Sequence, residues 1–172
     1  DFLIQSLVKL SRMESGIIAV HSEDTTIKQM LESIQQQFNV KVREKNITLS
    51  LCDTDLHVRC DSKWTVEALG NIVDNAIKYA ACGGNVQVKA EQYSFFVKID
   101  IIDDGIGIEK EEIPKIFGRF YRSLSVADQP GVGIGLFLAR EIIQAQKGYI
   151  KVTSKRGKGS TFSVFLPIAK KE

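Results

Sequence analysis

The sequence predicts a single α/β domain, a two-layer sandwich in which a mixed, mostly antiparallel β-sheet packs on about three α-helices. Three observations support this prediction. Long segments with apolar residues at helical spacing alternate with short β-branched segments. Two of those segments, 85–92 and 95–103, are separated by a short polar turn and are typical of a hairpin. The 172 residues suffice for one ordinary domain and are too few for two.

Each element follows from a local pattern. Thr25 or Thr26 is expected to cap the second helix, and Asp61 the third. Gly148 follows the last helix and is expected to end it. The expected helices are 2–15, a second one that starts at about 27 and has apolar positions as far as 38, a third that starts after 61 and ends before 83, and a fourth over about 131–147. Short helical turns are expected around Pro114. The expected strands are 17–20, 47–51, 58–60, 85–92, 95–103, 149–154 and 160–166.

Composition narrows the possible functions. An apolar content of 44% and a charged content of 26% are typical of a globular chain. The net charge of +2 gives no reason to expect nucleic acid as a partner. No apolar run approaches the ~20 residues that span a bilayer, so we expect a cytoplasmic domain. The amphipathic opening without an initiator Met suggests a fragment of a longer protein.

The three cysteines do not form a recognisable site. Cys52, Cys60 and Cys82 are odd in number and lack a CxxC spacing, so we expect reduced, mostly buried thiols. His21 and His57 are isolated in the sequence, and surface or strand positions are expected for both.

The segment EALGNIVDNAIK (67–78) is the most informative part of the chain. On a helix, Glu67, Asn71, Asn75 and Lys78 fall within roughly an 80° arc, opposite the apolar residues. Asn is a mediocre helix former because its short amide competes for backbone groups. Two mid-helix Asn and a Lys on one stripe therefore indicate side chains that bind something, although a solvated stripe is the simpler alternative.

Two glycine-bearing loops suggest what is bound. DDGIGI (103–108) follows a strand, and GVGIG (131–135) opens a helix whose free N–H groups suit an anion. Lys78 and Arg122 could add positive charge. Asn75 offers an oxygen to Mg²⁺, which shares its shell with substrate phosphates. Asp103 offers the acceptor that an adenine amino group needs, so the pieces together predict a nucleotide–magnesium site.

Other nucleotide motifs do not fit. In GVGIGL, Leu136 stands at the final position of the dinucleotide fingerprint, and the strand–glycine–helix unit is wrong for it. GKGS (157–160) is not a P-loop, because a strand follows it rather than a helix. The protein-kinase signatures HRD and DFG are absent from the sequence.

The order of the motifs is more specific than any one of them. NIVDNAIKY, DDGIGI, IFGRFYR, GVGIGL and GKGSTF resemble the N, G1, F, G2 and G3 boxes of the GHKL ATP-binding fold. More narrowly, 25–167 resembles the catalytic ATP-binding domain of bacterial sensor histidine kinases. LVKLSRMESG resembles the end of the second helix of that family's dimerisation and phosphoacceptor domain. The resemblance implies a boundary, with 1–20 in that helix and its linker and 21–172 in the catalytic domain.

The resemblance also implies residue roles. Asn75 would coordinate Mg²⁺, while Asn71, Lys78 and Arg122 would be catalytic groups near the phosphates. Asp103 would bind the adenine amino group. Further nucleotide-binding positions would be Tyr79, Gly105, Gly107, Ile108, Phe120, Gly131, Gly133, Gly135, Leu136 and Ser160. Residues 121–132 would form the ATP lid, ordering on binding. Phe117 and Phe120 match the F box, with ordinary core packing as the alternative.

The resemblance implies phosphoryl transfer from ATP to a histidine and then to a response regulator. The family's phosphoacceptor motif is missing, so the histidine would come from the dimerisation domain of a homodimeric, membrane-anchored parent; the fragment itself would be a monomer. Three alternatives remain: a gyrase-type ATPase, an anti-sigma-factor serine kinase and a degenerate nucleotide sensor. Gyrase-type ATPases carry a general-base Glu where Asn71 stands, and an amide cannot take that proton.

Overall fold

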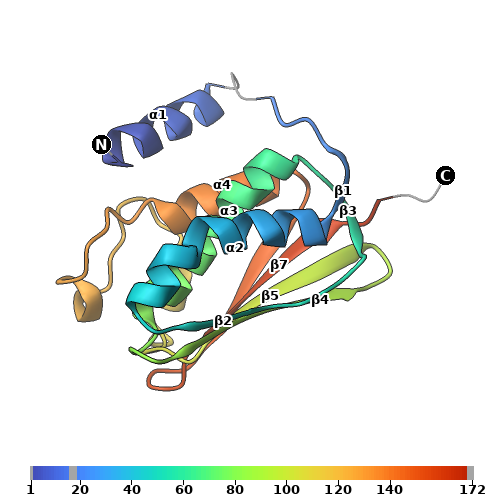
Figure 1. Cartoon of the computed structure of the whole chain (residues 1–172). Helices are drawn as coiled ribbons and strands as arrows, with labels where there is room; N and C mark the ends of the chain where they lie inside the picture. Colours follow the sequence, from blue (N-terminus) through green and yellow to red (C-terminus); the bar gives the residue numbers. More distant parts are fainter. Residues whose placement is uncertain (1, 16–18, 170–172) are drawn as a thin grey trace.

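Three helices lie on one face of a five-stranded sheet in the computed structural model, which describes residues 2–15 and 19–169 (Figure 1). These helices are α2 (Ile27–Glu44), α3 (Ser62–Tyr79) and α4 (Gly135–Ala145). A further helix, α1 (Phe2–Glu14), lies apart from the two layers (Figure 1). The predicted two-layer sandwich is confirmed, with α1 in addition to the three helices that cover the sheet.

The five-stranded sheet is mixed and mostly antiparallel, as predicted. Its order is β2–β4–β5–β7–β6, and the pair β2–β4 is parallel while the other pairs are antiparallel. The strands are β2 (Thr48–Leu51), β4 (Asn85–Gln92), β5 (Phe96–Asp103), β6 (Tyr149–Ser154) and β7 (Ser160–Pro167). Asp103, the last residue of β5, pairs with Ser160, the first residue of β7. The register therefore brings two predicted site residues together.

A second, two-stranded sheet corrects one expectation. β1 (Glu23–Thr26) pairs antiparallel with β3 (His57–Cys60), so the strand lies after 17–20 and not within it. Residues 17 and 18 lie outside the described residues, and Ala19 and Val20 are not in a strand. Thr25 is 6% exposed and faces Val58, so this β-branched residue packs in the strand. The cap of α2 is the next residue, Thr26.

The helix starts follow the predicted capping chemistry. The Thr26 hydroxyl accepts a hydrogen bond from the Gln29 backbone N–H at 3.4 Å. The Asp61 carboxylate does the same for the Trp64 N–H at 3.1 Å, which starts α3. A side-chain oxygen at this position satisfies one of the backbone donors that a helix start leaves free. Both helices therefore begin where the sequence predicts.

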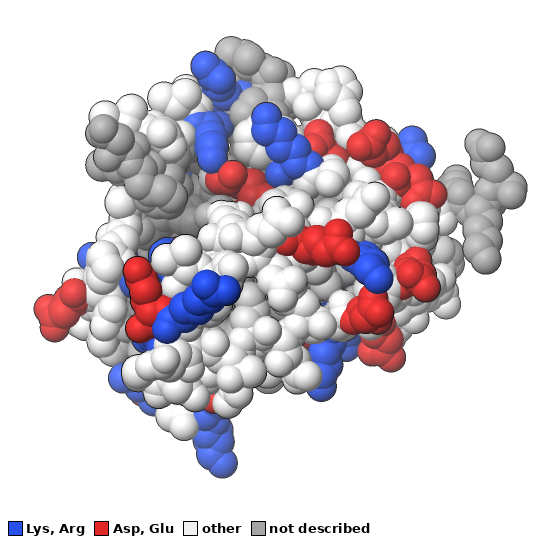
Figure 2. Space-filling model, in the orientation of Figure 1, with Lys and Arg blue, Asp and Glu red and all other residues white. Residues whose placement is uncertain are grey.

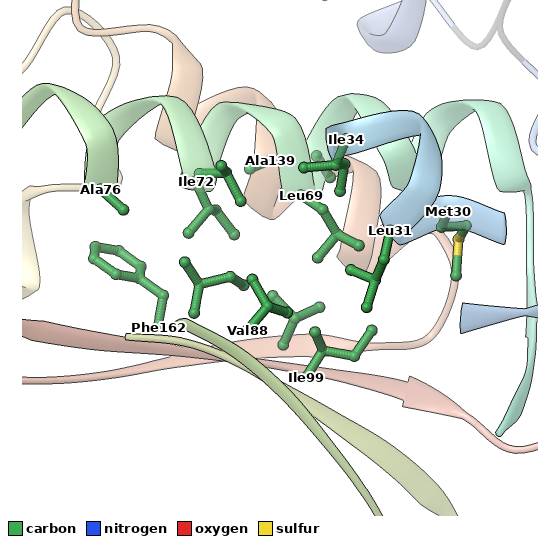
Figure 3. Packing of buried hydrophobic residues seen from close by; sticks show 14 of the residues in the cluster. Met30, Leu31, Ile34, Leu69, Ile72, Ala76, Val88, Ile99, Ala139 and Phe162 are labelled. Carbon is green, nitrogen blue, oxygen red and sulfur yellow. The ribbon is translucent and has the colours of Figure 1, made fainter. Parts of the chain in front are cut away.

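The core lies between the helices and the sheet (Figure 3). Ile72 and Ala139 come from α3 and α4, and Val88, Ile99 and Phe162 come from the sheet below them. Each fully buried aliphatic side chain stabilises the fold by about 1.5–3 kcal/mol relative to exposure. Cys60 is buried and Cys52 is half-buried, but Cys82 is exposed, which corrects the expectation of mostly buried thiols. Cys82 lies in the turn after α3, where the chain has left the core.

The long connection between β5 and α4 contains little regular structure. It holds two short 3₁₀ helices, η1 (Ile113–Lys115) and η2 (Leu124–Val126). The face shown in Figure 2 mixes acidic and basic side chains rather than concentrating one sign. Within residues 2–15 and 19–169, no helix has the length and apolar character needed to cross a membrane.

Candidate nucleotide site

Three of the four residues in the polar stripe of α3 form one wall of a pocket, while the fourth, Glu67, lies outside it and pairs with Lys9 at 2.8 Å. Asn71, Asn75 and Lys78 line it, while Leu69 and Ile72 on the other side of α3 are buried in the core. The stripe is therefore turned to the pocket because the apolar side of the same helix packs on the sheet. The Nδ2 atom of Asn71 is buried and has no hydrogen-bond partner among the described residues. An unpaired buried amide donor is costly unless a ligand atom accepts its hydrogen bond.

Asp103 stands at the base of the same pocket, where β5 ends. Asp103 is 8% exposed as a residue, and its carboxylate accepts a hydrogen bond from the Gly105 backbone N–H at 2.9 Å. Burial raises the pKa of this carboxyl, and hydrogen bonds from the backbone N–H groups of Gly105 and Ser160 act against that shift. A buried carboxylate with spare acceptor capacity suits a ligand amino group.

The loop after β5 is held against the β6–β7 turn. The Gly157 N–H donates to the Ile106 carbonyl at 2.7 Å, and the Ile108 N–H donates to the Ser154 hydroxyl at 2.8 Å. Gly107 has φ +67°, and a Cβ there would lie 2.1 Å from the Lys155 carbonyl oxygen. Only glycine combines this backbone conformation with such a close approach. The second glycine of DDGIGI therefore lets the loop dock on the turn.

Residues 121–132, the segment predicted to be the lid and called the lid below, line another side of the pocket. The Nη2 atom of Arg122 donates to the carbonyls of Val126 and Ala127, each at 2.9 Å, and also to the carbonyl of Gln129. This guanidinium thus gathers three lid carbonyls around itself. Arg122 also lines the pocket, so it stands between the lid backbone and the space that a ligand would fill.

The lid ends at the N-terminus of α4. Gly133 has φ +77°, and a Cβ there would lie 2.6 Å from the Tyr121 carbonyl oxygen. α4 starts at Gly135, and its N-cap residue, Ile134, makes no side-chain capping bond. The first N–H groups of the helix are therefore available to an anion in the pocket. Lys78 lies at the same end, because its Nζ would be 2.8 Å from a Cβ on Gly131.

The pocket brings together all but two of the predicted site residues. It is lined by Asn71, Asn75, Lys78, Tyr79, Asp103, Gly107, Ile108, Arg122, Gly131, Gly133, Gly135, Leu136 and Ser160. Gly105 lies behind Asp103 and supports its carboxylate instead of lining the pocket. Phe120 is outside the lining and 55% exposed. Its φ of +59° reverses the chain there, and Tyr121 and Arg122 face the pocket instead.

Several lining residues were not predicted. Glu112 and Tyr121 line the pocket and share a hydrogen bond of 3.1 Å. Phe162 closes the floor and meets Phe117 edge-on at 6.4 Å, so Phe117 takes part in core packing. Phe162 could have been found, because it stands two residues after Ser160 on the same strand face. No local sequence pattern marks Glu112, since its position in the pocket depends on how the turns after it fold. Ser123, Ser125, Val126, Pro130 and Val132, like Tyr121, belong to the segment predicted to be the lid. The other lining residues without a predicted role are Asp74, Ala76, Ile106, Ile116 and Ile134.

The donor set fits a nucleotide and Mg²⁺. Asn71, Asn75 and Lys78 line the pocket, and so does the start of α4, which has no side-chain cap. Mg²⁺ takes oxygen ligands and shares its shell with phosphates, which suits Asn75. Among the described residues no group of three His, Cys, Asp or Glu side chains could hold a metal alone. A metal here would accordingly depend on ligand oxygens as well as on the protein.

Comparison with known sequences supports this assignment. Residues 60–170 match the family described as histidine kinase-, DNA gyrase B-, and HSP90-like ATPase. Sensor histidine kinase WalK of Bacillus subtilis is 33% identical over 170 residues, which cover 96% of this chain and 28% of WalK. Adaptive-response sensory kinase SasA of Synechocystis is 31% identical over 171 residues, covering 98% of this chain and 45% of SasA. The chain thus spans less than half the length of either relative.

Solved structures agree on the fold. The mycobacterial sensor histidine kinase MprB superposes with a TM-score of 0.77 at 26% identity, covering 88% of this chain and all of that one. ShkA in complex with AMPPNP gives a TM-score of 0.86 at 21% identity, covering 98% of this chain and 36% of that one, and shows the shared fold. The relatives WalK and MprB are sensor histidine kinases. The family match over residues 60–170 and the shared architecture show that this chain belongs to the family of histidine kinase-, DNA gyrase B- and HSP90-like ATPases.

Proposed function

We propose that this domain binds Mg²⁺–ATP and presents the γ-phosphoryl group to a histidine on a dimerisation domain. The observation that carries the proposal is the convergence of the α3 stripe and the buried Asp103 on one pocket. A second support is the unpaired Nδ2 of Asn71, which awaits an acceptor such as a phosphate oxygen. The structure of ShkA, which shares this fold, is a complex with AMPPNP, and this supports an adenine nucleotide as the ligand.

Each wall would contribute a different part of the binding. Asp103 would accept a hydrogen bond from the adenine amino group, which selects adenine over guanine because guanine carries an oxygen at that place. Lys78 and the N–H groups that start α4 would hold the phosphates. Asn75 would hold Mg²⁺, whose charge would neutralise the phosphate oxygens. The protein would thereby position the γ-phosphorus in line with an incoming imidazole nitrogen while ADP leaves.

The carboxylates around the pocket argue against a gyrase-like hydrolase. Three of them line it, and each already has partners. Asp74 pairs with Lys41, and Glu112 accepts from the Tyr121 hydroxyl at 3.1 Å. Asp103 accepts from backbone N–H groups. With an amide at Asn71, none of these is placed as a general base for water. ATP hydrolysis at gyrase-like rates by this chain would contradict the proposal.

Titration with a fluorescent ATP analogue tests nucleotide binding. Asn75→Ala is expected to weaken Mg²⁺-dependent affinity about 10- to 100-fold, because it removes a contact to a charged group. Asp103→Asn is expected to weaken affinity for ATP by a similar factor and to reduce the preference over GTP. Asn39→Ala is the matched control, since Asn39 is an exposed helical residue outside the pocket. Unchanged affinity in both pocket variants would eliminate the site.

Trans-phosphorylation tests the transfer step. The chain, ATP and Mg²⁺ would be mixed with the dimerisation helices of the parent protein, and acid-labile phosphohistidine is the expected product. Failure to form it while ATP still binds would favour the degenerate sensor. We further propose that α1 (Phe2–Glu14) is the end of the second helix of the dimerisation domain and that the linker to the catalytic domain extends to about residue 20. The parent would then be a homodimer that signals to a response regulator, with this domain in the cytoplasm.

A further inference from the structure

The β6–β7 turn reaches the lid through a single side chain. Arg156, in the middle of that turn, donates from Nη1 to the Ser125 hydroxyl of η2 at 3.3 Å. Its Nε lies 3.8 Å from an Oε1 atom of Glu109, just beyond the loop after β5. Ser125 itself lines the pocket, and so does Ile108, the residue before Glu109. Arg156 therefore bridges the loop at the base of the pocket and the lid above it.

The base of this bridge is rigid. The Lys155 carbonyl lies so close to Gly107 that only glycine fits there, and Gly157 donates to the Ile106 carbonyl at 2.7 Å. The turn is thus fixed to the loop on both sides of Arg156. The lid end of the bridge is different, because Leu124 next to Ser125 is 93% exposed. When the contact between Arg156 and Ser125 opens, we therefore expect the lid to move while the β6–β7 turn stays in place.

We propose that Arg156 is a positioning residue that holds η2 of the lid closed over the nucleotide and so lengthens nucleotide residence. It acts through Ser125 and does not line the pocket itself. The inference rests on the proposed nucleotide site for its effect on residence. The lid restraint itself is a property of the free protein and can be measured without nucleotide.

The expected size of the effect on nucleotide release follows from the solvent exposure of the Arg156 side chain. The Arg156 side chain is 41% exposed, and a contact of this kind contributes weakly in water. We expect Arg156→Gln to accelerate release of a fluorescent ATP analogue about two- to fivefold, with a smaller change in association. Lys158→Gln removes the same charge from the same exposed turn and is the matched control. Ser125→Ala breaks the contact from the lid side and should match Arg156→Gln.

A double variant tests whether Arg156 and Ser125 affect nucleotide release through one shared contact. If Arg156 acts through Ser125, then Arg156→Gln combined with Ser125→Ala should release nucleotide no faster than either single variant. Additive effects, or an equal acceleration by Lys158→Gln, would overturn the proposal. Additive effects would mean that the two residues act independently, and an equal acceleration by Lys158→Gln would mean that general charge governs release.

Proteolysis of the free protein provides the independent readout. Chymotrypsin can cleave after Leu124 only when η2 opens, so appearance of the 1–124 product by mass spectrometry reports the lid. We expect faster cleavage there in Arg156→Gln and Ser125→Ala, and wild-type cleavage in Lys158→Gln. Equal cleavage in all four proteins would refute the bridge. Faster cleavage with no nucleotide binding by any protein would keep the bridge and reject the proposed nucleotide site.

Discussion

The two walls of the pocket are built in different ways. The wall formed by α3 and the end of β5 rests on fully buried side chains such as Ile72 and Ile101, both 0% exposed. The lid has no buried residue among 121–132, all of which the structure describes. It is held by Arg122 from within and by Arg156 from the neighbouring turn. The fixed wall can therefore keep a precise donor set, while the lid can open at little cost in stability.

The comparison of the two walls predicts that the largest loss of stability follows a substitution in the core behind the wall formed by α3 and the end of β5, the fixed wall. Ile72→Ala should lower the free energy of unfolding by about 2–5 kcal/mol, because it leaves a cavity between α3 and the sheet. Val126→Ala in the lid should change it by less than about 1 kcal/mol, since Val126 is only half-buried. Urea unfolding of the two variants and the wild type measures both. Equal losses would show that the lid is packed as firmly as the wall.

The junction of the lid with α4 should show an intermediate effect. Gly133 and Gly157 share φ +77°, but only Gly133 has a neighbour in the way of a Cβ, namely the Tyr121 carbonyl oxygen. Gly157→Ala should therefore lower stability by the backbone strain alone, about 1 kcal/mol. Gly133→Ala should lower it by about 2–3 kcal/mol, because the chain must also move. Thermal unfolding compares the two; equal shifts in Tm would mean that the lid accommodates the methyl group freely.

The substitution Asp103→Asn should change the free energy of unfolding least, and this change should depend on pH. Burial raises the pKa of its carboxyl, so the folded state binds an extra proton between the unfolded pKa, about 3.9, and the raised folded value. The contribution is fully present below the unfolded pKa and is lost as pH rises through the folded pKa. Wild type should therefore lose stability relative to Asp103→Asn over this acidic interval.

Urea unfolding of both proteins from about pH 3.5 upward measures the difference, and the other titrating groups cancel because the two proteins share them. A difference between the proteins that stays constant with pH would contradict the raised pKa. A wild type that gains stability relative to the variant as pH rises would contradict even its direction.

Much of the fixed wall was predictable from local patterns. The stripe of Asn71, Asn75 and Lys78 follows from helical spacing, and Asp61 marks the start of that helix. Alternation placed β5 and β7, and Asp103 and Ser160 are at the strand ends where the sequence predicts them. These predictions succeeded because each depends on interactions within a few residues of the chain.

The positive φ angles of Phe120 and Lys147 were not predictable from the sequence. Phe120 has φ +59° and Lys147 has φ +62°. With its positive φ, Phe120 lies outside the pocket lining. The residue in the left-handed conformation after α4 is Lys147 and not the expected Gly148. Gly148 is needed for a different reason, since a Cβ there would lie 2.3 Å from the Phe165 carbonyl oxygen. Neither residue type signals such a conformation, because tertiary contacts impose it.

The amino-acid sequence by itself determined the α-helices, the strands apart from β1, and the order of the polar and glycine motifs, because these depend on spacing along the chain. Only the tertiary structure decided that Glu112 and Tyr121 enter the pocket, that Arg122 gathers lid carbonyls and that Arg156 meets Ser125. Such contacts join segments whose separation is set by the packing of helices on the sheet, and no local pattern records that distance.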